Sequence, residues 1–220
     1  MSSQQSGNVK DKELTPFQES LYILVALNNR IKKALNAMVS KDHMEDEDLK
    51  FTITNHIHIL LCSFWDEWEH LEALRGDDKI KTTLKITSPA LKRIRKWKGL
   101  HRVRSMLLAH GHRDRDGDAV LPWDVFGKYD APTAYAETIL LGNCALLAVA
   151  VVITQHSADY QEVYSRLSKK KRDIEDKGIQ TMEEVKKDFS KIKDEMLVEM
   201  SKVTGVHIDT LRKDLDEKTR

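Results

Sequence analysis

The sequence contains few of the residues that interrupt helices or cross-link a chain. Its 220 residues include four prolines, nine glycines and two cysteines. So few helix breakers leave long uninterrupted segments, which are typical of a helical chain rather than a β-rich one. Because Cys62 and Cys144 lie in apolar runs, we expect free buried thiols in a reducing compartment and no disulfide framework.

The sequence shows no secretory signal and no apolar run of the length expected for a membrane span. The first 14 residues are polar and lack the apolar core of a secretory signal, so we expect residues 1–14 to be disordered. The most apolar run, residues 139–153, is interrupted by Gly142 and Asn143. It is shorter than the roughly 20 residues that a membrane span requires, which is more typical of a core helix. The sequence therefore predicts a cytoplasmic protein with no membrane partner.

The charge is balanced overall but uneven along the chain. The formal net charge is +1, which indicates no class of partner. Residues 42–78 hold eleven acidic and two basic side chains, whereas residues 79–104 hold ten lysines or arginines and no acid. Two interpretations follow: neighbouring helices that neutralise each other, or a basic face for a polyanion.

Capping signals and apolar periodicity predict the first two helices. Thr15 followed by Pro16 is typical of an N-cap with proline in the first turn. A second helix is expected to begin near residues 52–54 and to end at Gly76, after an acidic loop over residues 41–50.

The next segment is expected to form one long helix. Ser88 and Pro89 predict its N-terminus, and Gly111 is placed as a stop signal after His110. Residues 111–131 then form a long loop, and loops of that length are often functional.

The rest of the chain, from residue 132 onward, is also predicted to be helical. Pro132 opens an apolar helix that is expected to reach about Leu167. Thr181 and Glu184 have the spacing of a capping box before an amphipathic helix, which Gly205 ends. A short helix completes the chain.

Together these signals predict an all-α protein. We expect an up-and-down helical bundle of about four main helices, followed by a charged helical C-terminal extension. The predicted divisions are a disordered segment 1–14, a bundle 15–167 and an amphipathic extension 168–220.

Arg104 stands out in the basic segment. On a helix over residues 91–110, at about 100° per residue, it lies roughly 40° from Leu100 and so within the apolar face. Burying an unpaired guanidinium costs several kcal/mol. Arg104 therefore needs a cleft, a subunit interface, or an acidic partner on the preceding helix such as Asp66 or Glu69.

His110 suggests a chemistry for this helix. A histidine in a last turn interacts favourably with the helix dipole, which is a sufficient structural explanation. Yet Arg104 and His110 are separated by a rise of only about 9 Å, so their side chains could meet at one phosphate. Imidazole transfers protons near neutral pH, and guanidinium stabilises a phosphate oxyanion. Such a pair suffices for metal-free RNA cleavage, because the ribose 2′-OH supplies the nucleophile.

The segment from Arg104 to His110 resembles the Arg-x(4–6)-His motif of HEPN domains, here with five intervening residues. The resemblance covers roughly residues 15–165. It implies a homodimer in which the motif helices meet. Many members are metal-independent endoribonucleases, often toxins or antiphage effectors, whereas others only bind nucleotides or partners. Carried over, His110 would be the general acid/base and Arg104 would hold the scissile phosphate.

Two positions depart from the family's pattern. His112 stands where a well-known subgroup has a tyrosine that a partner modifies, and Ser105 replaces the more usual Asn or Asp. We expect Ser105, Lys98, Arg102 and His112 to lie near the RNA backbone. RNA is the expected partner, together with a second copy of the chain and an antitoxin or other regulatory protein.

No metal or cofactor is expected. His58, Cys62, Asp66 and His70 recur every four residues, but a straight helix spreads them over about 18 Å, too far for one ion. The aspartates of residues 114–118, with the neighbouring histidines, lack the spacing of an EF-hand and are typical of a polar turn.

The leading functional hypothesis is a HEPN-like endoribonuclease that acts as a toxin or defence effector. The alternative is a non-catalytic HEPN-like module that binds a nucleotide or a partner. A third interpretation, a helical adaptor, rests on the apolar stripe of the C-terminal helix.

Overall fold

The computed structural model describes residues 13–40, 46–105, 119, 125, 128–169, 178–179 and 181–218. Within these residues the chain forms eight helices and no strand, which confirms the all-α prediction. The chain divides into two compact units, Met1–Lys170 and Lys171–Arg220. The predicted disorder of residues 1–14 lies almost wholly outside the described residues.

The first helix of the bundle, α1 (Pro16–Met38), begins where the sequence predicts. Thr15 Oγ1 accepts a hydrogen bond from the backbone N–H of Gln18 at 3.2 Å, and the Gln18 side chain accepts one from the Thr15 N–H. This reciprocal cap satisfies two amide groups that a helix start leaves without partners.

Helix α2 (Glu47–Ala73) begins earlier than the expected start near residues 52–54. Asp46 is its N-cap and accepts a hydrogen bond from the Leu49 N–H at 2.9 Å. Acidic side chains in a first turn are stabilised by the helix dipole. Part of the expected acidic loop is therefore the charged first turn of α2.

Helix α3 (Asp78–Arg95) shows that the predicted N-terminus at Ser88 is wrong. The N-cap is Asp77, which accepts hydrogen bonds from the N–H groups of Lys79 and Ile80. Pro89 lies inside the helix. Two residues before it, the Thr87 hydroxyl donates a hydrogen bond to the backbone carbonyl of Thr83 at 2.9 Å. This side-chain hydrogen bond supports the turn that precedes the proline.

The predicted continuous helix up to His110 is also wrong, because the chain breaks before Gly99 and resumes as the short helix α4 (Leu100–Val103). The Gly99 N–H donates to the Asp130 carbonyl at 2.7 Å. A Cβ atom on Gly99 would lie 2.6 Å from that same oxygen. A close backbone contact with a distant segment thus fixes the break, and only glycine fits it.

The expected helix from Pro132 to about Leu167 is two helices, α6 (Tyr135–Gln155) and α7 (Ser157–Lys169). His156 separates them and is buried. Its Nε2 is hydrogen-bonded to Thr83 Oγ1 at 3.0 Å, and its ring lies 4.4 Å from that of Phe17. These contacts with α3 and with α1 accompany the change of direction.

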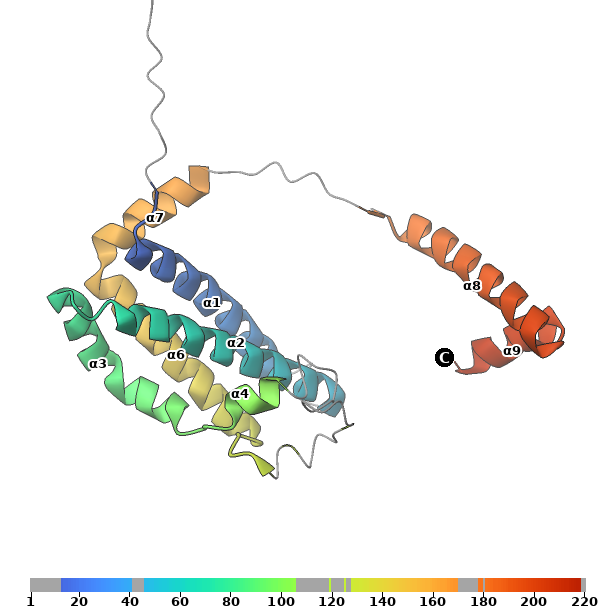
Figure 1. Ribbon diagram of the computed structural model, residues 1–220, viewed down its shortest axis with the longest axis horizontal. Coiled ribbons are helices and arrows are strands. Elements are labelled where there is room, and N and C mark those ends of the chain that lie inside the picture. Colours follow the sequence, from blue (N-terminus) through green and yellow to red (C-terminus); the bar gives the residue numbers. More distant parts are fainter. Residues whose placement is uncertain are drawn as a thin grey trace, which may run out of the picture. The chain divides into compact units, whose positions relative to one another are not determined.

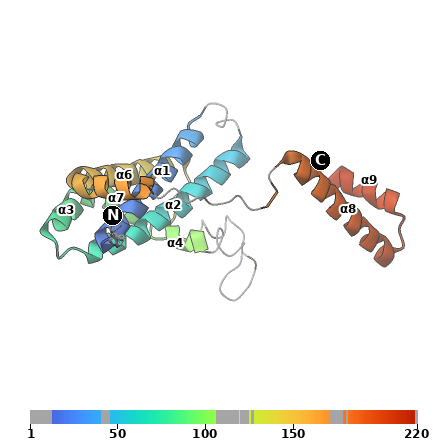
Figure 2. The same cartoon turned by 90° about the horizontal axis from the view of Figure 1, so that it is seen from above.

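The bundle is built around α1, α2 and α6 (Figures 1 and 2). Helix α1 packs against α2, α6 and α7, and α6 also packs against α2 and α3. The largest fully buried side chains are Trp68, Phe64, Leu21, Leu24, Ile31, Met38, Ile57, Leu61, Leu71, Ile94, Leu100 and Leu141. By length and composition α6 could also cross a membrane, a property that it shares with core helices of soluble proteins.

The second unit contains α8 (Met182–Thr204) and α9 (Ile208–Lys218). The predicted capping box is present: Thr181 Oγ1 accepts from the Glu184 N–H, and Glu184 accepts from the Thr181 N–H. Gly205 ends α8 in the left-handed region, at φ 69°, which confirms the predicted stop. Leu197 and Leu211 are the buried apolar side chains described in this unit.

Candidate functional site

The Arg104 side chain lies directly after α4 and bonds to the preceding acidic helix. Its Nη1 donates to Asp66 Oδ2 at 3.0 Å, one of the two carboxylates that the sequence suggested as partners. The guanidinium is 32% exposed and the carboxylate 50% exposed. The expectation of a buried Arg104 is therefore wrong: Leu100 and Val103 are buried, and Arg104 lies at the edge of their face.

The imidazole of His101 lies beside the same Asp66 carboxylate. His101 Nδ1 lies 3.7 Å from Asp66 Oδ1, and the His101 ring meets the Trp65 ring edge-on at 4.9 Å. Arg104 and His101 are three residues apart, which is neighbour spacing on a helix. Sequence reasoning passed over His101, although this spacing from Arg104 was a visible signal.

Basic side chains lie over two aromatic rings beside α4. Arg95 lies over the Trp65 ring with its guanidinium 5.6 Å from the centroid. Arg102 and Lys128 lie over the Tyr129 ring, each at 5.6 Å. Cation–π contacts of this kind stabilise charged side chains against aromatic faces. Two aromatic rings, each carrying cations, thus accompany the short helix that precedes Arg104.

Some of the basic segment is neutralised by neighbouring helices. Arg95 pairs with Glu72 of α2 at 2.8 Å, as Arg104 pairs with Asp66. Arg93 pairs instead with Glu137 of α6. Lys92, Lys96 and Lys98 are exposed. Acidic residues of α2 and α6 therefore pair with Arg93, Arg95 and Arg104, while these lysines remain at the surface.

Four of the six predicted site residues are described. Ser105 directly follows Arg104 and is half-buried, Arg102 is half-buried against Tyr129, and Lys98 is exposed in the turn before α4. His110 and His112 lie outside the described residues, as do the aspartates of the expected polar turn. The structure therefore places the phosphate-binding half of the predicted pair and gives no geometry for the imidazole half.

His58, Cys62, Asp66 and His70, which recur every four residues along α2, each have different surroundings. His58 is buried, and its Nε2 is hydrogen-bonded to Thr138 Oγ1 at 3.2 Å. Burial lowers the pKa of His58 to about 4 and raises the pKa of the buried Cys62 thiol to about 12. His70 lies 3.7 Å from Glu67. Over the part of the chain that the structure describes, no cluster of three or more such side chains could hold a metal ion.

Comparisons with known proteins give no family for this chain. No protein-family model, no curated protein and no solved structure matches it.

Proposed function

We propose that the bundle is a HEPN-like, metal-independent endoribonuclease of the toxin or antiphage type. The observation that carries the proposal is the placement of Arg104. The Arg104 side chain is 32% exposed, and it shares its partner Asp66 with the His101 imidazole. The neighbouring His101 and Arg102 contact the rings of Trp65 and Tyr129. The resemblance of the segment from Arg104 to His110 to the family's motif supplies the roles.

The chemistry needs only proton transfer and charge stabilisation. An imidazole, His110, takes the proton from a ribose 2′-OH as the oxygen attacks the neighbouring phosphorus. The bond between phosphorus and the 5′-oxygen breaks, and that oxygen takes the proton from the His110 imidazolium, which yields a 2′,3′-cyclic phosphate and a free 5′-OH. Arg104 donates hydrogen bonds to the phosphate oxygens, whose negative charge grows in the transition state.

The ion pair with Asp66 is compatible with this role. Solvent-exposed ion pairs contribute only about 0–1 kcal/mol, because both charges are well hydrated when separated. Asp66 is half-exposed. A phosphate that accepts two hydrogen bonds from the guanidinium would replace the carboxylate at small cost. Asp66 then holds the Arg104 side chain in position when no phosphate is bound, and it does not prevent a phosphate from binding there.

The surroundings suit single-stranded RNA. Proteins bind unpaired bases by stacking them on aromatic rings and on guanidinium planes, while basic side chains follow the backbone. The rings of Trp65 and Tyr129 contact His101 and Arg102 of α4, and Lys98 and Arg102 supply positive charge. Such binding should weaken steeply as salt rises, since counterions are released from the phosphates.

Cleavage of mixed RNA in the presence of EDTA tests the proposal. We expect wild-type protein to cleave, and Arg104→Ala and His110→Ala each to lose at least about 100-fold in rate. His56→Ala, an exposed histidine of α2, serves as the matched control and should cleave like the wild type. Unchanged cleavage by both variants would overturn the assignment.

A second candidate is a non-catalytic HEPN-like module that binds a nucleotide or a partner. The pairing of Arg104 with Asp66 and of Arg95 with Glu72 favours it, since both arginines already have acidic partners. This candidate gains if wild-type protein binds RNA or nucleotide without cleaving it. The homodimer through the motif helix, an antitoxin or regulatory partner, and a cytoplasmic location remain parts of the proposal.

A further inference from the structure

Helix α3 carries four exposed lysines in a single line along its solvent-facing side. We call Lys81, Lys85, Lys92 and Lys96 the lysine row. At about 100° and 1.5 Å per residue, they fall within an arc of about 60° and span about 22 Å. The Lys96 N–H still donates to the Lys92 carbonyl at 3.1 Å, so the helical spacing holds to the end of the row. The row lies roughly opposite the buried face of α3, which is formed by Ile80, Thr83, Thr87, Leu91 and Ile94.

The acids of the neighbouring helices do not neutralise the row. Residues 79–104 include no acid. Glu72 of α2 pairs with Arg95, and Glu137 of α6 pairs with Arg93. Of the ion pairs formed among the residues that the structure describes, none includes a lysine of the row. The row is therefore a line of positive charge without a counter-charge in the described part of the chain.

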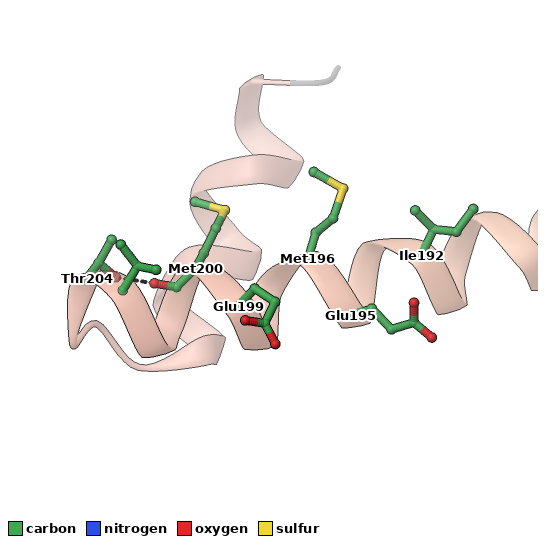
Figure 3. A pocket seen from close by; sticks show the side chains of 7 residues that line it. Ile192, Glu195, Met196, Glu199, Met200 and Thr204 are labelled. Carbon is green, nitrogen blue, oxygen red and sulfur yellow. Dashed lines mark hydrogen bonds between the residues drawn. The ribbon is translucent and has the colours of Figure 1, made fainter.

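Other helices of the chain pair basic side chains with acids one turn away. Arg166 pairs with Glu162 on α7. Lys191 pairs with Glu195 on α8, where Glu195 also lines an open groove (Figure 3). In the lysine row, by contrast, the residue four positions from each lysine is another lysine, and like charges at this spacing destabilise a helix. A solvated surface that mixed both signs would avoid this destabilisation, so the row indicates an anionic partner.

The linear shape of the row indicates which polyanion fits. A nucleic-acid strand carries its charges in a line, and basic side chains bind such a strand by following its backbone. A membrane presents its charges across a plane, and helices that bind it also bury apolar side chains in it. Ile86, the exposed isoleucine of α3, points about 110° away from the middle of the row. A membrane surface is therefore a poorer fit than a nucleic-acid strand.

The row leads into the candidate site. Helix α3 runs along the bundle toward α4 (Figure 1). Two residues after Lys96, Lys98 is exposed in the turn before α4, and Arg102 follows over the Tyr129 ring. Basic side chains thus continue from the row to the residues that directly precede Arg104.

We infer that the lysine row binds the phosphate backbone of a single-stranded RNA, outside the residues proposed to cleave it. The row holds one part of the strand along α3, and α4 holds the part beside Arg104. Contacts of this kind with phosphates carry no sequence information, so the row binds RNA of any sequence. The choice of RNA as the polyanion rests on the proposed function, whereas binding at the row does not depend on cleavage.

Binding of a 2′-O-methyl oligouridine to the full-length chain over a range of salt concentrations tests the row. This RNA lacks the free 2′-OH and so cannot be cleaved. The variant with all four lysines of the row changed to Gln should lower the slope of log affinity against log salt by about 3, at roughly 0.7 per lost phosphate contact. At about 0.1 M salt its dissociation constant should rise at least about 100-fold.

A matched variant removes the same net charge elsewhere. Lysines 32 and 33 of α1 and lysines 186 and 187 of α8 are exposed, and changing these four to Gln should leave the slope and the affinity as in the wild type. Equal slopes for the wild type and the row variant, at equal helical content, would overturn the inference. Absence of oligouridine binding by the wild type would also overturn it, as would binding through the row to phosphatidylserine vesicles but not to RNA.

Cleavage kinetics distinguish failure of the row from failure of the proposed function. Lys81→Gln combined with Lys85→Gln changes the end of the row away from α4, and it should raise KM for long RNA roughly 20-fold while kcat stays unchanged. Wild-type KM in this variant would contradict the row and leave the ribonuclease proposal standing. A wild type that binds oligouridine through the row but cleaves no RNA would end the ribonuclease proposal and leave the row standing.

Discussion

The bundle and the C-terminal hairpin, which is α8 with α9 in the second unit, are made from helices with the same kind of apolar periodicity. They bury their apolar side chains to very different extents. Leu61 and Trp68 of α2 are at most 1% exposed, whereas Phe189 of α8 is 66% exposed. In the bundle, neighbouring helices of the same unit cover the apolar faces of α1 and α2. The comparison teaches that periodicity identifies an apolar face but not what covers it.

The largest expected difference between the two units comes from removing a buried leucine from each. Leu61 and Leu197 are both fully buried. Leu61→Ala leaves a cavity in a closed core and should lower the free energy of unfolding by about 3–5 kcal/mol. Tryptophan fluorescence during urea denaturation isolates the first unit, because all four tryptophans lie within residues 65–123.

Leu197→Ala is the matched variant in the hairpin. It should leave the tryptophan-detected transition where it is in the wild type, because Leu197 belongs to the other unit. A shift comparable to that of Leu61→Ala would show that the two units unfold together and that the contrast between them is wrong.

The pH dependence of the bundle should follow its buried His58. The pKa of His58 is about 4 in the folded state and 6.5 without burial. The unfolded chain therefore binds the proton first as pH falls. Stability should decline between pH 6.5 and 4 by about 3 kcal/mol from this residue, and level off below pH 4. Burial also lowers the pKa of His156, which acts in the same direction.

Urea denaturation at several pH values measures this slope. His58→Gln should flatten it, because the amide can still hydrogen-bond to Thr138 but does not titrate. His207→Gln, an exposed histidine of the hairpin, should leave the slope unchanged. A slope that survives His58→Gln would assign the pH dependence to other groups.

A smaller effect is expected at the break before α4. Gly99→Ala would place a methyl group 2.6 Å from the Asp130 carbonyl oxygen, so the backbone must shift, at a cost of about 1–3 kcal/mol. Gly76→Ala is the matched control, since no atom lies within 4 Å of its added Cβ. If Gly99→Ala denatures at the same urea concentration as Gly76→Ala, the contact with Asp130 does not fix the break.

The features that the sequence predicted correctly depend on nearby residues, although the equally local caps at Asp46 and Asp77 were missed. The caps at Thr15 and Thr181 and the stop at Gly205 are confirmed, because each rests on groups within a few positions of one another. The breaks at Gly99 and His156 were not predicted. They depend on contacts with Asp130 and Thr83, which only the folded chain brings close.

The same distinction applies to the candidate site. Asp66 was suggested as a partner of Arg104, because an arginine among apolar residues requires one and α2 is rich in acids. The helical wheel placed Arg104 inside the apolar face because it ignores side-chain length: the long Arg104 side chain reaches Asp66, where it is 32% exposed. His101 was missed although it lies three residues before Arg104; its contact with Asp66 joins positions that only the folded chain brings close.

Binding of single-stranded RNA by Asp66→Asn tests most directly the proposal that the Arg104 guanidinium is available to a phosphate. Losing the ion pair should change stability by no more than about 1 kcal/mol. We predict that Asp66→Asn binds RNA more tightly than the wild type, and that the gain disappears when Arg104→Ala is added. Affinity equal to that of the wild type, or a gain that persists without Arg104, would contradict the account.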